Sequence, residues 1–249
     1  MATVAVMEVK AAGPLTTIQD RGRFGFGRYG VAPSGALDSV AMRIANLLVD
    51  NPEEEGVLEI TLPGFTATVL ADAVMAVAGA DLGWHQNDQP LGMWQSHRFR
   101  KGDTIAFREL NSGCRAYLSV GGGWEVPEIM GSKSTNLSSG FGGLGGRPLQ
   151  KGDVLWSASP QLFLGAGGRK FDLNAVPAYH GCWELRVVLG PQDDHFDKAA
   201  QDLFLNAVYR VSAHTDRTGI RLIGAQISAK EGMAESILSE GVVPGTVQI

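Results

Sequence analysis

Residues 18–46 read IQDRGRFGFGRYGVAPSGALDSVAMRIAN and join a charged, glycine-rich loop to a helix. Asp20 and Arg21 stand beside glycines, which let a backbone turn sharply or approach a ligand closely. Ser34 is a good N-cap, and apolar residues follow it at helical spacing, so we expect a helix over residues 37–49. The free N–H groups at the start of that helix would lie beside the polar loop, which makes this stretch a candidate site.

The composition is that of a globular protein. Of the 249 residues, 44% are hydrophobic, which is enough for a core in one large or two smaller domains. The net charge is −5 and the basic residues are scattered, so we expect no nucleic-acid partner. The start of the chain does not read as a signal peptide, and Asp72 interrupts the most apolar stretch. We therefore expect no membrane span and a cytoplasmic protein.

Glycine-punctuated runs of Val, Ile, Leu and Phe predict a mainly β fold with a few helices. A second helix is expected at residues 197–205. A change of composition at residues 165–177 predicts a boundary between an N-terminal β-rich domain, residues 1–170, and a C-terminal β domain, residues 180–249. Strands are expected at residues 2–10, 57–60, 66–70, 74–78, 104–108, 115–120, 154–157 and 185–189.

Two similar segments, RKGD at residues 100–103 and QKGD at residues 150–153, each precede a strand-like run. Glycine supplies a positive φ and aspartate caps a turn, so Asp103 and Asp153 are interpreted as structural. The two turns bracket residues 121–147, a segment too long and too rich in glycine for a simple hairpin. We interpret it as an active-site loop.

No arrangement typical of a resident metal site is present in the sequence. The five histidines are dispersed, the two cysteines have no CxxC neighbour, and HExxH, P-loop and GxSxG motifs are absent. Four polar clusters beside glycines remain, and each is either a solvated turn or part of one shared polar pocket. The clusters are Asp20, Arg21, Ser34 and Asp38; residues 131–136; residues 190–194; and Asp216, Arg217, Gly219 and Arg221.

Seven motifs rich in glycine and charge follow one another along the chain. They are QDRGRFGFGRYGV (19–31), PSGALD (33–38), AN (45–46), GSKSTN (131–136), GGLGGRPLQKGD (142–153), RVVLGPQDDHF (186–196) and SEGVVPGTVQI (239–249). In this order they resemble the KipA family, which is also known as the C subunit of 5-oxoprolinase, as allophanate hydrolase subunit 2, or as the A and B subdomains of biotin-dependent carboxyltransferases. Where the family usually has Asn, Arg and Met, this chain has Asp216, Arg217 and Thr218.

The resemblance implies two β-barrel-like domains, the C-terminal one cyclophilin-like. It implies a complex with a KipI-like B subunit and with an A subunit, which opens a lactam, 5-oxo-L-proline, to L-glutamate. That reaction uses ATP and Mg²⁺, held by this chain or by its partners. The family pattern continues with further strands after the last motif, so we expect a truncated C-terminal domain.

The same resemblance leaves two other functions open. One is a carboxyltransferase component of a urea or amide carboxylase, with biotin carried by a separate partner. The other is a KipA-like regulatory protein that binds a KipI-like partner. Neighbouring genes for the A and B subunits would favour the oxoprolinase, a biotin carboxylase gene would favour carboxyl transfer, and a sensor kinase gene would favour regulation.

The chemistry of lactam opening guides the choice of site residues. Activating the amide oxygen, most simply by phosphorylation, and then admitting water requires groups that stabilise an oxyanion and move a proton. Arginine and lysine would hold phosphate or carboxylate groups, aspartate would bind Mg²⁺ or act as base, and hydroxyls would orient the substrate. The expected catalytic residues are Asp20, Arg21 and Asp38, and the expected substrate-binding residues are Ser34, Gly35, Lys133, Ser134, Thr135, Gln192, Asp194 and Arg217.

Overall fold

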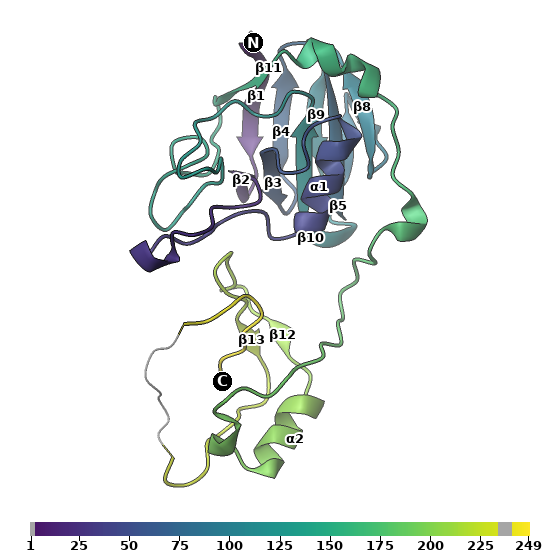
Figure 1. Ribbon diagram of the computed structural model, residues 1–249. Coiled ribbons are helices and arrows are strands. Elements are labelled where there is room, and N and C mark those ends of the chain that lie inside the picture. Colours follow the sequence, from purple (N-terminus) through teal and green to yellow (C-terminus); the bar gives the residue numbers. More distant parts are fainter. Residues whose placement is uncertain (1–2, 234–240) are drawn as a thin grey trace. The chain divides into compact units, whose positions relative to one another are not determined.

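The computed structural model describes residues 3–233 and 241–249 (Figure 1). Residue 2 of the first expected strand and residues 239 and 240 of the last motif lie outside the described residues. The chain divides into two compact units, Met1–Trp183 (unit 1) and Glu184–Ile249 (unit 2). Within the described ranges, no helix has the length and apolar character needed to cross a membrane.

Unit 1 contains two antiparallel sheets. Sheet A has the strand order β11-β1-β4-β9-β6-β7, and sheet B has the order β2-β3-β10-β5-β8. The mainly β prediction is confirmed, but both strand orders are linear, so these are open sheets and not closed barrels. Sheet A consists of β1 (Thr3–Ala12), β4 (Phe65–Val69), β6 (Trp84–Gln86), β7 (Gln89–Pro90), β9 (Thr104–Phe107) and β11 (Val154–Ala158). Sheet B consists of β2 (Leu15–Gln19), β3 (Val57–Thr61), β5 (Ala73–Asp81), β8 (Gln95–Phe99) and β10 (Ser112–Val120).

The two sheets share one hydrophobic core. Phe65 and Phe107 of sheet A and Leu58 and Leu118 of sheet B all belong to it, and none is more than 1% exposed. Burial of a side chain of this size contributes roughly 1.5–3 kcal/mol. Trp84 stacks on Phe107 within the same core. Apolar burial between the sheets therefore holds unit 1 together.

Helix α1 (Ser39–Leu48) covers the outer face of sheet B, in front of the strands in Figure 1. Its Ala41 and Ala45 pack in a cluster with Val57 and Ala78 of the sheet. As a result β5, which lies between β10 and β8 in sheet B, has buried residues on both faces. Sheet B is thus the middle layer of unit 1, between sheet A and α1.

The helix starts later than expected. Asp38 is the N-cap, and its side chain accepts a hydrogen bond from Ala41 N at 2.9 Å. The assignment of Ser34 as the cap was wrong, because Ser34 has a φ of 57° and belongs to the preceding loop. Residues 37 and 38 are therefore outside the helix, and the Asp38 carboxylate lies at its N-terminus.

The segment after β11 belongs to unit 1 as far as Trp183. The Phe171 and Tyr179 rings lie 5.9 and 6.3 Å from the Trp94 ring, centroid to centroid. These aromatic contacts join residues 171–179 to unit 1. The expected division into residues 1–170 and 180–249 stays a prediction. The short 3-10 helices of the chain are η1 (Gly27–Tyr29), η2 (Pro160–Ala166), η3 (Leu173–Ala175) and η4 (Asp193–His195).

Unit 2 contains α2 (Lys198–Asn206), the second expected helix, with Asp197 as its N-cap, and a pair of short strands, β12 (Arg210–Val211) and β13 (Leu222–Ile223). The strand expected at residues 185–189 does not form: these residues have no strand partner in the described chain, and Val188 is 96% exposed. An apolar run becomes a strand only where a neighbouring strand takes up its hydrogen bonds. The cyclophilin-like assignment of this unit stays a prediction.

Hydrogen exchange should be faster in unit 2 than in unit 1. Among the described residues of unit 2 none is buried, whereas unit 1 has a continuous core. Amides that rely on few buried apolar contacts open at low free energy. Exchange measured by mass spectrometry on the full chain should show protection in β5 and β10 and little in α2. Equal protection of α2 and β10 would contradict this prediction.

The KGD segments are turns, as predicted. Asp153 accepts two hydrogen bonds from Arg147, each at 2.8 Å, and one from Gln150 N at 2.7 Å. The hydrogen bonds from Arg147 lower the pKa of Asp153 below its ordinary value of 3.8. The Asp153 carboxylate therefore stabilises the fold in its ionised form.

The stability that Asp153 contributes should disappear in acid. It is fully present above the unfolded-state pKa near 3.8 and is lost as the pH falls through the lower folded-state value. Asp153→Asn should therefore cost about 1 kcal/mol near pH 7 and almost nothing near pH 2.5. Urea denaturation of both proteins at the two pH values measures this, and an equal difference at both would contradict it.

Candidate functional site

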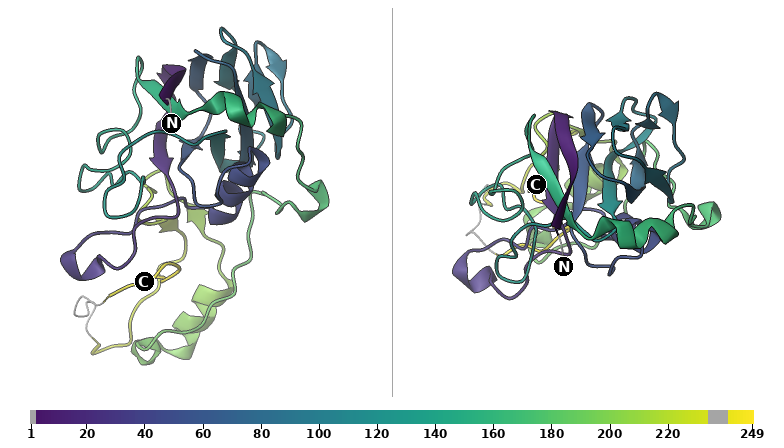
Figure 2. Two further views of the ribbon diagram at one scale, coloured as in Figure 1. Left: turned by 45° about the horizontal axis from the view of Figure 1, so that its top comes forward. Right: turned by 90° about the horizontal axis from the view of Figure 1, so that it is seen from above.

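Three loops of unit 1 meet at the end of β2, the edge strand of sheet B. Figures 1 and 2 show them on the side of unit 1 opposite to β8. The first loop begins where β2 ends, at Gln19, and the second, residues 131–136, is attached to the same strand. Thr135 donates to the Ile18 carbonyl from its backbone N–H at 2.9 Å and from its hydroxyl at 3.0 Å. Segments far apart in the sequence are thereby brought together.

The Asp20 carboxylate links these two loops. It is 6% exposed and accepts hydrogen bonds from four donors. Oδ1 accepts from Gly22 N at 2.7 Å, from Ser132 Oγ at 2.7 Å and from Ser134 Oγ, while Oδ2 accepts from Lys133 N at 2.6 Å. Hydrogen bonds to an ionised acceptor are the strong ones in proteins. The carboxylate expected to act as a base thus holds the backbone of two loops in place.

Residues 33–36 form the third loop. The Gln19 amide oxygen accepts from Gly35 N at 3.1 Å, and Ala36 N donates to the Asp20 carbonyl at 2.8 Å. A Cβ at Gly35 would lie 2.8 Å from the Arg21 carbonyl oxygen, and Gly35 has a φ of 92°. Gly35 therefore allows two backbones to touch, which is a structural reason for the glycine expected to bind substrate.

The glycine-rich segment at residues 140–146 folds over the second loop. Gly143 N donates to the Lys133 carbonyl at 2.9 Å, and Asn136 N donates to the Phe141 carbonyl at 2.8 Å. A Cβ at Gly142 would lie 2.1 Å from the Ser134 carbonyl oxygen. This close contact explains the glycine at position 142.

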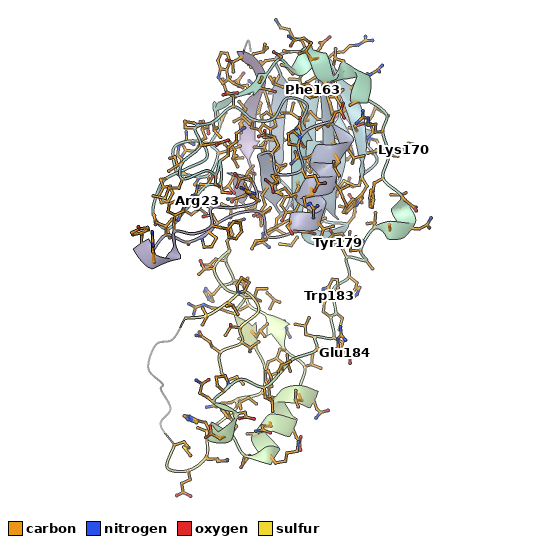
Figure 3. All side chains as sticks on the ribbon, viewed as in Figure 1. Arg23, Phe163, Lys170, Tyr179, Trp183 and Glu184 are labelled. Carbon is orange, nitrogen blue, oxygen red and sulfur yellow. The ribbon has the colours of Figure 1, made fainter. Side chains whose placement is uncertain are left out.

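Arg23 lies inside this group of loops and was not among the expected site residues (Figure 3). It is 1% exposed, donates to the carbonyls of Ser134 and Ile129, and has the Phe141 ring 4.8 Å from its Cζ. Burial lowers the pKa of Arg23, and the nearby charge of Asp20 partly opposes that shift. Its Nη1 has no hydrogen-bond partner among the described residues. Its position directly after Gly22 in the quoted stretch was the available sequence signal.

Arg21 and Lys133, the two cations that were expected in this region, are each paired with a glutamate. Arg21 is exposed and forms an ion pair with Glu54 at 2.8 Å. Lys133 is mostly buried, and its Nζ contacts Glu55 Oε1. Both charges are therefore neutralised within the chain, and an anionic ligand would have to compete with a carboxylate for either of them.

Asp38 belongs to a separate network at the start of α1. Its Oδ2 accepts from the Tyr179 hydroxyl at 2.7 Å, and its backbone N–H donates to the Tyr117 hydroxyl at 2.8 Å. The Tyr117 hydroxyl in turn donates to Glu59 at 3.1 Å. Burial raises the pKa of both tyrosines, so both stay protonated hydrogen-bond donors at neutral pH. Glu59 and both tyrosines were not expected here.

The comparisons with known proteins identify the family. The family model described as carboxyltransferase domain, subdomain A and B, matches residues 29–249, which is most of the chain. The chain belongs to this family. The match includes two of the three loops and all of unit 2.

Individual relatives fall into two groups. The chain is 36% identical to the C subunit of the 5-oxoprolinase of Escherichia coli K12, over 98% of this chain and 76% of the relative. It is 35% identical to the urea amidolyase of Lachancea kluyveri, over 87% of this chain but 12% of that much longer protein. The crystal structure of the K. lactis urea amidolyase superposes with a TM-score of 0.83 at 33% identity, over 92% of this chain and 14% of that one.

The remaining expected residues of this carboxyltransferase-family chain lie in unit 2. Gln192 is the N-cap of η4, and the Asp194 carbonyl accepts from Lys230 Nζ at 2.7 Å. Arg217 is partly exposed, and the desolvation of its guanidinium lowers its pKa to about 10. A substrate-binding role for Gln192, Asp194 and Arg217 stays a prediction.

Asp20 and Asp38, the acidic residues of unit 1 expected to bind Mg²⁺, do not fit that role. The Asp20 oxygens are occupied by N–H and O–H donors, and those of Asp38 by Ala41 N and Tyr179. Mg²⁺ needs oxygen ligands that are free to face it. Over the described part of the chain, no group of three His, Cys, Asp or Glu residues is placed to hold a metal ion.

Proposed function

We propose that this chain is the C subunit of a cytoplasmic, ATP-dependent 5-oxoprolinase complex that opens 5-oxo-L-proline to L-glutamate. The observation that carries the proposal is the 36% identity to the E. coli relative, which runs through 98% of this chain and three quarters of that protein. The relation thus covers most of a protein that is named as one separate chain of an oxoprolinase. The urea amidolyases match over a small part of a long chain.

In this proposal the loops around Asp20 form one wall of the lactam site. Asp20 acts as a positioning residue that fixes residues 131–136, where Ser134 and Thr135 lie. Asp38 orients the Tyr179 hydroxyl, and Arg21, Ser34, Gly35 and Lys133 shape the rim. Gln192, Asp194 and Arg217 of unit 2 are the further substrate-binding residues of this proposal. ATP and Mg²⁺ bind chiefly to the KipI-like B subunit and to the A subunit, because the aspartates of unit 1 are already saturated.

Reconstitution tests this function. The full chain is coexpressed with candidate A and B subunits, and ATP-dependent release of glutamate from 5-oxoproline is measured. We expect turnover with all three chains and a loss of at least about 100-fold when this chain is omitted. Full activity of the A and B subunits alone would reject the proposal.

A carboxyltransferase function is the second candidate. The TM-score of 0.83 to the K. lactis urea amidolyase over 92% of this chain favours it. There the site would receive carboxybiotin from a separate carrier and carboxylate a urea or amide nitrogen. Incubation of the chain with a biotin carboxylase, a biotinylated carrier, bicarbonate, ATP and urea would then give carboxylated urea. Absence of that product, together with glutamate release in the first assay, selects the oxoprolinase.

A further inference from the structure

Arg23 is a buried cation that no carboxylate neutralises by a direct hydrogen bond in the described structure. Its partners are the Ser134 and Ile129 carbonyl oxygens and the Phe141 ring. Asp20 is near enough to raise the pKa of Arg23, but its oxygens receive other donors. A buried charge with incomplete pairing is costly to the fold. An anionic ligand at Arg23 would complete the pairing.

The free donor of Arg23 is Nη1. A Cβ at Gly142 would lie 2.9 Å from Nη2, so the glycine-rich segment crowds that nitrogen, while Nη1 has no protein acceptor in the described ranges. The Nη2 side of the guanidinium is thus packed against protein, and the Nη1 N–H groups can still donate to one more acceptor. A single oxygen of a small planar group suits this geometry.

Phe141 covers this position. Its side chain is half-buried, whereas Arg23 beneath it is fully buried. Gly140 and Gly142 flank Phe141 with φ of 67° and 75°. Because neither neighbour carries a Cβ, the Phe141 side chain can rotate about its own torsions without meeting one. The Phe141 backbone stays hydrogen-bonded to Asn136, so only the ring moves aside.

We propose that Nη1 of Arg23 binds the carboxylate of the substrate, and that the Phe141 ring turns away to admit it. This inference rests on the proposed function, in which the substrate is 5-oxoproline. A carboxylate fits better than a phosphate, because the negative charge of nearby Asp20 would oppose a dianion more strongly. Arg23 is then a substrate-binding residue, and the lactam ring lies toward the surface beside Phe141.

The test compares two ligands that differ only in the carboxylate, 5-oxoproline and pyrrolidin-2-one. Dissociation constants are measured by calorimetry on the reconstituted complex of full-length chains, without ATP. Arg23→Gln should weaken 5-oxoproline binding by about 10- to 100-fold and leave pyrrolidin-2-one unchanged. Arg28→Gln is the matched control, because Arg28 also faces an aromatic ring, that of Tyr29, but is exposed. It should bind both ligands as the parent does.

A folded Arg23→Gln variant that binds 5-oxoproline like the parent overturns the inference. Where that variant does not fold, Phe141→Ala keeps the guanidinium and removes its cover, and 5-oxoproline should then associate several-fold faster. An unchanged association rate also overturns the inference. Binding of 5-oxoproline through Arg23 in a complex that releases no glutamate would support this inference and reject the proposed function. Glutamate release, together with an Arg23→Gln variant that discriminates between the two ligands as the parent does, would support the proposed function and reject this inference.

Discussion

Replacing Asp20 by asparagine should lower the free energy of unfolding of unit 1 by about 2–4 kcal/mol. Four donors converge on the carboxylate, three on Oδ1 and one on Oδ2. Asparagine offers one acceptor oxygen and one NH₂ group. If its oxygen takes the Oδ1 position, its NH₂ meets the Lys133 N–H, 2.6 Å from the present Oδ2, and two donors then face each other.

Asp88→Asn is the matched control. Asp88 is an exposed aspartate whose side chain is 80% accessible and pairs with Arg108 at the surface. Its replacement should change the free energy of unfolding by less than about 0.5 kcal/mol. Guanidinium denaturation measures both variants, and hydrogen exchange at the Lys133 amide reports the loop directly. An equal loss in both variants would mean that Asp20 does not hold the loops together.

The sheets of unit 1 were largely predictable because their strands carry a local signal. Alternating or continuous apolar runs mark β1, β3, β4, β5, β9, β10 and β11. The strands that were missed are short or polar, such as β2 (LTTIQ) and β8 (QSHRF). Their strand character comes from pairing with β3 and β5. Residues 185–189 show the opposite case, in which the pattern is present and no partner is described.

The site was predictable in part. Two of the four polar clusters do meet, because Asp20 bonds directly to residues 132–134. The choice of Arg21 over Arg23 could not be decided from the sequence, since both are arginines beside glycines. Only the fold shows that Arg21 is exposed and Arg23 buried. Glu59 could not be predicted either, because its role also depends on the fold. It lies on β3, on the face of sheet B that carries α1. Its carboxylate accepts hydrogen bonds from the residue 37 N–H and from the Tyr117 hydroxyl.

Gly142→Ala should have the second large effect, a loss of about 3 kcal/mol or more in the stability of unit 1. Its cost has two parts. Alanine with a φ of 75° is strained by roughly 1–2 kcal/mol, as any residue with a Cβ would be. Its Cβ would also lie 2.1 Å from the Ser134 carbonyl oxygen, which is backbone and cannot rotate away. The glycine-rich segment must then lift off residues 133–136.

Gly145→Ala separates the two parts. Gly145 has a φ of 69°, close to that of Gly142, but nothing lies within 4 Å of a Cβ built there. It should therefore lose only the roughly 1–2 kcal/mol of conformational strain. The difference between the two variants in denaturation then measures the backbone contact with Ser134. Because that contact also keeps Phe141 over Arg23, Gly142→Ala should expose Arg23 to solvent, and Gly145→Ala should not. Equal losses of stability in Gly142→Ala and Gly145→Ala would contradict the prediction, because the contact between Gly142 and Ser134 would then contribute nothing to the stability of unit 1.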